Sequence, residues 1–150
     1  MIFGDGPDRP RVLDEIARRG LEGVVTAPGF VDGQEVDSTL AEALCMVLPS
    51  SREGYGLIVV EAASLGVPSV VVAGQDNAAT DLISEGENGF VAPSASPGDL
   101  GAAIERVHAS GPRLRLSTAA WFGRNAERLS LEGSLRTVAE AYTAPSSARR

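Results

Sequence analysis

The chain has 150 residues, of which 43% are hydrophobic, 22% charged and 5% aromatic, as in a single globular domain. This composition excludes a collagen-like chain, a coiled coil and a disordered tail, and no apolar run reaches the ~18 residues of a membrane-spanning helix. The net charge of −7 disfavours binding to nucleic acid, because phosphate groups would be repelled. The single cysteine, Cys45, cannot form an internal disulfide, which predicts a cytoplasmic protein.

Short β-branched runs alternate with helical patterns over the first two thirds of the chain. The runs show little alternation of polar and apolar residues, as in parallel strands that are covered on both faces. We expect strands at Met1–Phe3, Gly23–Thr26, Cys45–Pro49, Ser69–Ala73 and Gly89–Val91. The helical patterns between them are Arg9–Arg19, Val36–Ala43, Leu57–Leu65 and Ala79–Ser84.

The last third of the chain is helical. Its three patterns are Pro97–Ala109, Pro112–Arg128 and Leu131–Tyr142. The whole order predicts an α/β fold, a Rossmann-like doubly wound parallel sheet of about five strands with a helical C-terminal trailer. We expect one domain over residues 1–143 and a frayed tail over residues 144–150.

The start of the chain carries a further expectation. A doubly wound sheet rarely opens on a strand of three residues, so we expect Met1 to be a cut point inside a longer protein. Strands missing before Met1 would leave a free sheet edge, and such an edge can pair with another copy of the chain.

The segment from Pro49 to Ala62 holds the densest group of residues suited to ligand binding. It joins the end of an expected strand to the first turn of an expected helix, and open α/β sheets bind ligands at this edge. The helix N-terminus offers unpaired N–H groups and the positive end of a dipole, both suited to a phosphate. Gly54 and Gly56 have no Cβ, so the backbone can approach a ligand closely.

Two carboxylates, Glu53 and Glu61, flank this turn. A carboxylate can accept hydrogen bonds from two sugar hydroxyls, and Glu61 lies among apolar residues, where a charge needs a partner. A sugar nucleotide, with hydroxyls at both ends and a diphosphate between them, has the matching shape. The alternative is that the two acids only complement the helix dipole and are solvated.

These residues resemble the donor-binding signature of family-four retaining glycosyltransferases, which have the GT-B fold. The hallmark is a pair of Glu residues with seven residues between them, here Glu53 and Glu61. The resemblance continues in order at Gly4-Asp5-Gly6-Pro7, Gly29-Phe30-Val31, Pro49-Ser50, Gly66-Val67-Pro68, Asp81-Leu82-Ile83 and Asn88-Gly89-Phe90-Val91. It covers residues 1 to about 142 and implies one half of a GT-B fold.

The resemblance implies a role for each matching residue. The residues implied to bind the donor sugar are Glu53, Gly54, Tyr55 and Gly56. The backbone amides of Leu57 and Ile58 would bind the distal phosphate, and Glu61 would hold the ribose hydroxyls. The backbone of Val31 would contact the edge of the base.

The family transfers a sugar from a nucleoside diphosphate to an acceptor, with retention at the anomeric carbon and usually without a bound metal. We therefore expect hexosyl transfer to a glycan, lipid or small molecule, with no cofactor and no metal ligands; the sequence has no Asp-x-Asp or His-rich spacing. The family's Arg and Lys before the Gly4 turn, and its N-terminal acceptor domain, are not in this chain. The segment Asn77–Thr80 stands where the family commonly has a glycine pair.

These departures predict a donor-binding half that is inactive alone and whose partner is the missing N-terminal GT-B domain. Any association with the inner membrane would come through that domain. Two alternatives stay open: a non-catalytic GT-B-like interaction module, and a fragment of a GT-B nucleotide-sugar epimerase. A dinucleotide-binding reading of Gly4 and Gly6 is weak, because the third glycine of that fingerprint is missing.

Overall fold

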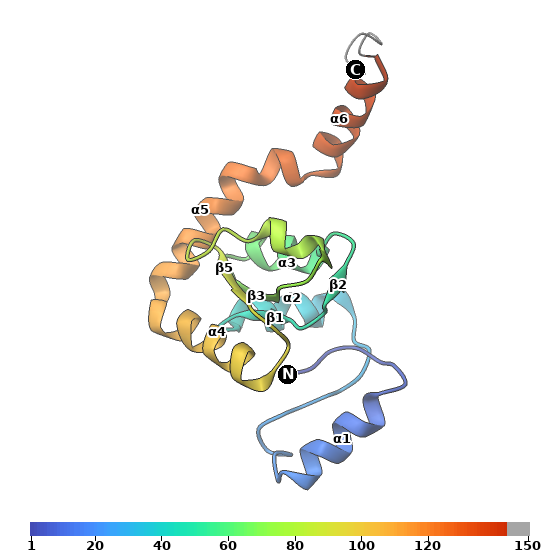
Figure 1. Ribbon diagram of the computed structural model, residues 1–150, viewed down its shortest axis with the longest axis vertical. Helices are drawn as coiled ribbons and strands as arrows, with labels where there is room; N and C mark the ends of the chain where they lie inside the picture. Colours follow the sequence, from blue (N-terminus) through green and yellow to red (C-terminus); the bar gives the residue numbers. More distant parts are fainter. Residues whose placement is uncertain (144–150) are drawn as a thin grey trace. The chain divides into compact units, whose positions relative to one another are not determined.

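The computed structural model describes residues 1–143, and the expected tail at 144–150 lies outside the described residues. The chain forms two compact units, Met1–Glu42 and Ala43–Arg150. Helices α1 (Arg9–Arg18) and α2 (Gly33–Glu42) belong to the first unit, and the strands and other helices belong to the second (Figure 1). The expectation of a single domain stays a prediction.

The two strands expected in the first unit are not formed. Phe3 and Gly29 make an isolated bridge, and the Ile2 N–H donates to the Thr26 carbonyl at 2.8 Å. Two segments that pair only with each other make a marginal sheet, because no third strand supports them. The expectation of strands at 1–3 and 23–26 is therefore wrong, whereas the helix expected from Arg9 is confirmed.

The main sheet of the second unit has three parallel strands in the order β1-β3-β5. These strands are β1 (Met46–Leu48), β3 (Ser69–Val72) and β5 (Gly89–Ala92). A separate two-stranded parallel sheet joins β2 (Arg52–Glu53) to β4 (Asp76–Asn77). The α/β class is confirmed, but the main sheet is smaller than the expected five strands.

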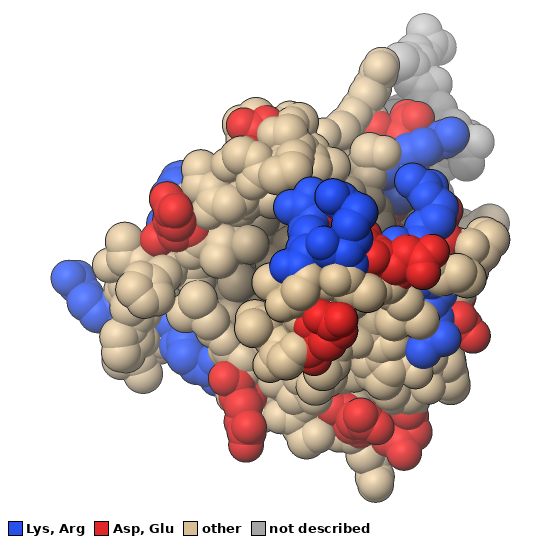
Figure 2. Space-filling model, turned by 90° about the horizontal axis from the view of Figure 1, so that it is seen from below, with Lys and Arg blue, Asp and Glu red and all other residues tan. Residues whose placement is uncertain are grey.

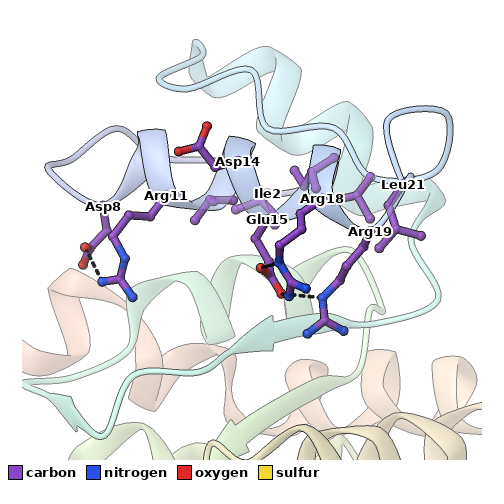
Figure 3. Close-up of a pocket in the computed structure, with 11 residues that line it drawn as sticks. Ile2, Asp8, Arg11, Asp14, Glu15, Arg18, Arg19 and Leu21 are labelled. Atoms are coloured by element: carbon purple, nitrogen blue, oxygen red, sulfur yellow. Dashed lines mark hydrogen bonds and ion pairs between the residues drawn. The ribbon is translucent and has the colours of Figure 1, made fainter.

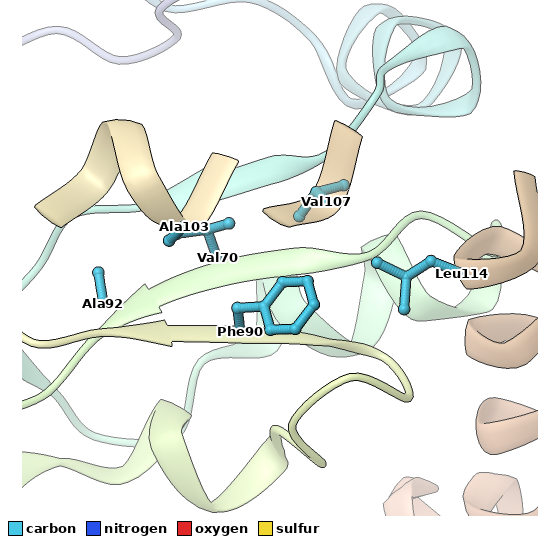
Figure 4. Packing of buried hydrophobic residues seen from close by; sticks show 6 residues of the cluster. All are labelled: Val70, Phe90, Ala92, Ala103, Val107 and Leu114. Carbon is cyan, nitrogen blue, oxygen red and sulfur yellow. The ribbon is translucent and has the colours of Figure 1, made fainter. Parts of the chain in front are cut away.

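Helices cover both faces of the main sheet, as a doubly wound arrangement requires. Helix α4 (Pro97–Ser110) contacts β3 and β5, and α3 (Leu57–Ser64) contacts β1 and β3. The core cluster on the α4 side is Val70, Phe90, Ala92, Ala103, Val107 and Leu114 (Figure 4). Because side chains alternate along a strand, buried Val71 faces the opposite side.

Local signals in the sequence set the ends of the C-terminal helices. The Ser96 hydroxyl accepts the Asp99 N–H at 3.2 Å and Pro97 follows it, so α4 has both a cap and a proline at its first position. Gly111, with φ of 60°, separates α4 from α5. Helices α5 (Pro112–Leu129) and α6 (Leu131–Thr143) complete the described chain, as expected.

The helix expected at 79–84 is a 3₁₀ helix instead, η1 (Ala78–Leu82). Its N-cap is Asn77, whose side chain accepts the Ala79 N–H. Five residues make hardly more than one turn, and the 3₁₀ form is common in such short pieces. The loop after η1 is tied to α5 by Trp121, whose indole N–H donates to the Ser84 hydroxyl at 3.0 Å.

Arginine side chains and carboxylates lie beside one another on the face drawn in Figure 2. An ion pair joins Arg106 to Glu85 at 2.7 Å, with the Arg106 guanidinium 4.0 Å from the centre of the Phe90 ring. Within residues 1–143, no helix is both long and apolar enough to cross a membrane.

Candidate functional site

The N-terminus of α3 follows a left-handed glycine and leaves backbone N–H groups available. Gly56, the residue before the helix, has φ of 87° and ψ of 49°, a left-handed conformation that glycine adopts without a steric penalty. No side chain caps the first turn. The N–H groups of Leu57 and Ile58 therefore stand at the positive end of the helix dipole, where an anion is stabilised.

Glu53 lies immediately before this turn, at the end of β2. It is half-buried and pairs in register with Asn77 of β4. Its neighbour Arg52 is 3.6 Å from Asp76, and both side chains are mostly exposed, so this ion pair adds little stability. The short β2–β4 sheet thus holds the Glu53 backbone next to the open helix end.

Glu61 lies on α3 and is exposed. The side chains one turn before and one turn after it, Leu57 and Leu65, are 66% and 38% exposed. The argument that apolar neighbours bury this carboxylate and force it to find a partner is therefore wrong, because these neighbours share its solvent-facing surface. The side chain is free to reach a ligand, and its role rests on position alone.

Val31 belongs to the first unit, where it precedes α2 and is half-buried. The other site residues expected from the sequence, Glu53 through Ile58 and Glu61, belong to the second unit. The structure brings together this second group. The contact of Val31 with a base stays a prediction.

Sequence reasoning missed the role of Asn77 beside this turn. This side chain is 3% exposed and donates to the Ser50 carbonyl at 2.8 Å, across 27 positions of the chain. No periodicity or spacing in the sequence connects those two residues. The signal in the sequence was that Asn77 begins the segment in which the family commonly has a glycine pair.

A cavity of about 660 Å³ lies in the first unit and contains none of the expected site residues. Apolar side chains line it together with charged residues of α1 (Figure 3). Its cations are already paired: Arg11 contacts Asp8 at 3.0 Å, and Arg18 and Arg19 both bind Glu15. We therefore assign the candidate site to α3, where backbone N–H groups are available.

Two other reactive residues do not join the site. Cys45 packs beside Leu100 and Ile104 against the core cluster, and burial raises the pKa of its thiol, which disfavours the nucleophilic thiolate. His108 is exposed in the last turn of α4, where a cation is favourable next to the helix dipole.

Comparison with known proteins decides the family. The family described as glycosyl transferases group 1 matches residues 1–128. The chain belongs to this family. The resemblance noted at Glu53 and Glu61 is thus confirmed for the family, and the half-GT-B fold with it.

This group 1 chain is 34% identical over 115 residues to alpha-D-kanosaminyltransferase of Streptomyces kanamyceticus. This match covers 77% of the chain and 29% of the relative. It is 28% identical over 148 residues to D-inositol 3-phosphate glycosyltransferase of Streptomyces avermitilis. This match covers 98% of the chain and 31% of the relative. The chain therefore spans about a third of the length of these relatives.

The fold of the group 1 chain is similar to that of Anabaena HepE, solved in complex with UDP-glucose. The TM-score is 0.78 at 22% identity, and the match covers 94% of this chain and 39% of HepE. At this identity the likeness shows the fold.

Proposed function

We propose that this chain is the donor-binding part of a retaining glycosyltransferase, which transfers a hexose from a nucleoside diphosphate sugar to a glycan, lipid or small-molecule acceptor. The observation that carries the proposal is the uncapped N-terminus of α3 directly after Glu53 and the turn of Gly54 and Gly56. Family membership supports the same reaction class.

In this proposal each residue around the start of α3 has its own task. The N–H groups of Leu57 and Ile58 bind the distal phosphate, because hydrogen bonding and the helix dipole both favour negative charge there. Glu61 lies four residues after Leu57, or about 6 Å along the axis at 1.5 Å per residue. That distance is of the order that separates the ribose hydroxyls from the distal phosphate in an extended nucleoside diphosphate.

The donor sugar lies at the other side of the phosphate. Glu53 accepts hydrogen bonds from its hydroxyls, while Gly54, Tyr55 and Gly56 contact it through their backbone. Val31 contacts the base from the first unit. The reaction requires no metal in this proposal, because backbone N–H groups and the helix dipole stabilise the charge of the diphosphate.

The first test is calorimetric titration of the chain with UDP, GDP and NAD. UDP is the leading candidate because HepE was solved with UDP-glucose. We expect one nucleoside diphosphate to bind, NAD not to bind, and EDTA to leave the affinity unchanged. Glu61→Ala should weaken binding by roughly 10- to 100-fold, the loss expected for hydrogen bonds to a charged group.

Glu105→Ala is the matched control, because Glu105 is an exposed acid on α4 outside the site. It should bind like the unchanged chain. Equal binding by the Glu61→Ala variant would contradict the assignment of the ribose site. If neither UDP nor GDP binds to this chain or to an N-terminally longer protein, the proposed function is contradicted and an interaction module is favoured.

A further inference from the structure

One buried amide joins three separate segments beneath the candidate site. The Asn77 Nδ2 donates to the Ser50 carbonyl at 2.8 Å and to the Val72 carbonyl at 2.7 Å. Its Oδ1 accepts the Ala79 N–H at 3.1 Å. Ser50 begins the turn of residues 50–56, which we call the donor turn; Val72 ends β3 and Ala79 lies in the first turn of η1. A single side chain therefore joins all three segments.

Close packing joins the same segments. A Cβ at Gly74 would clash with the Ser51 carbonyl oxygen, and a Cβ at Gly56 would lie 2.7 Å from the Ala79 Cβ. The segment 74–79 therefore touches the donor turn near its start and at its end. Between these points Glu53 pairs in register with Asn77.

We propose that Asn77 is a positioning residue for the donor turn, residues 50–56: it holds this turn against segment 74–79 so that Glu53 and the open end of α3 are preorganised for the ligand. The hydrogen bonds demand this side chain, because a primary amide carries two donors and an acceptor whereas a carboxylate carries acceptors only. A turn that is ordered before binding avoids the entropy cost of ordering it with the ligand. The effect of Asn77 on nucleotide affinity rests on the proposed function. The restraint that Asn77 places on the donor turn does not depend on that function.

The chain offers a matched control in a second buried asparagine. Asn88 is 1% exposed; its Nδ2 donates to the Leu82 carbonyl at 2.8 Å and its Oδ1 accepts the Ser84 N–H at 2.7 Å. It fixes the loop before β5, and neither of these hydrogen bonds involves residues 50–56. Asn88→Asp thus removes a buried amide donor, as Asn77→Asp does, without touching the donor turn.

The rate of trypsin cleavage measures how firmly the donor turn is held, because Arg52 lies in this turn with an 82% exposed side chain. We expect Asn77→Asp to speed cleavage after Arg52 by about tenfold or more, because the substitution removes both hydrogen bonds that Nδ2 donates, to Ser50 and to Val72. Asn88→Asp should leave that rate unchanged. The amide NMR signals of Gly54 and Gly56 should shift in the first variant alone. Equal cleavage in both variants, or in Asn77→Asp and the unchanged chain, would overturn the proposal.

Titration with UDP tests the second half of the inference. Asn77→Asp should weaken UDP binding by about tenfold and Asn88→Asp should not. Faster cleavage, together with no binding of UDP or GDP by this chain or by an N-terminally longer protein, would remove the proposed function while keeping the restraint. Unchanged UDP affinity in a variant whose turn is loosened would overturn the positioning role.

A measurement on the unchanged chain covers the case in which Asn77→Asp does not fold. Native-state hydrogen exchange should show the amides of residues 51–55 and 76–79 opening together, with the same dependence on denaturant. Separate openings of these two segments would overturn the proposal without any substitution.

Discussion

At Gly56 two independent features exclude a side chain. The backbone has φ of 87°, which costs a residue with a Cβ roughly 1–2 kcal/mol, and a Cβ would lie 2.7 Å from that of Ala79. We expect Gly56→Ala to lower the free energy of unfolding by about 2–4 kcal/mol, because strain and overpacking add. Urea denaturation measures this, and UDP binding should weaken with it as the first turn of α3 shifts.

Gly123 is the matched control for this substitution. It lies inside α5, and a Cβ there meets nothing within 4 Å. Alanine is the better helix former, so Gly123→Ala should raise the free energy of unfolding by about 0.5–1 kcal/mol. Equal and small effects of the two substitutions would show that the left-handed turn before α3 is not a constraint.

At the scale of the element, α1 carries a pH dependence of known sign. Hydrogen bonds from Arg18 and then Arg19 lower the pKa of Glu15 from 4.5 to about 2. Because the folded pKa is depressed, the stabilisation of α1 is complete above about pH 4.5 and is lost as the pH falls toward 2. NMR titration of the Glu15 carboxyl should give this low midpoint, and salt should weaken the effect, since the groups are exposed.

Removing both cations separates this cause from a general acid transition. In the Arg18→Ala, Arg19→Ala double variant, the Glu15 midpoint should move back toward 4.5. The Asp8–Arg11 pair on the same segment stays intact and serves as the internal reference. An unchanged Glu15 midpoint would show that neither arginine controls this carboxyl.

Elements with local signals were predictable from the sequence, and elements made by long-range pairing were not. Helix α4 begins with Ser96 and Pro97 and ends at Gly111, so its signals lie within a few residues of its ends. Strand β3 is a serine followed by three valines, and it is buried throughout. In contrast, β2 and β4 have two residues each and exist because distant loops pair, which no local pattern encodes.

The candidate site divides in the same way. The turn from Glu53 to Gly56 and the start of α3 were predictable because they are contiguous in the chain and carry a family motif. The exposure of Glu61 was not, since it depends on which side of α3 faces the sheet. The support that Asn77 gives to Ser50 depends on where β1 and β3 end in space, and only the fold reveals it.

At the scale of the whole molecule, the second unit contains every strand described for the chain and the entire core cluster. Within residues 1–143, the donor turn and α3 also lie wholly in this unit. The chain beginning at Ala43 should therefore fold by itself, with one cooperative unfolding transition in urea. Absence of such a transition would show that the first unit is needed to stabilise the sheet.

The same shortened chain tests whether Val31 contributes to recognition of the base. The proposed phosphate and ribose contacts come from Leu57, Ile58 and Glu61, which do not depend on which base the nucleotide carries. If the base is read by Val31, removal of residues 1–42 should reduce the ratio of UDP to GDP affinities to near one while phosphate binding persists. Calorimetry with both nucleotides on the full and shortened chains measures this ratio. An unchanged ratio would place base selectivity in the second unit, and complete loss of binding by a folded shortened chain would show that α3 alone does not hold the diphosphate.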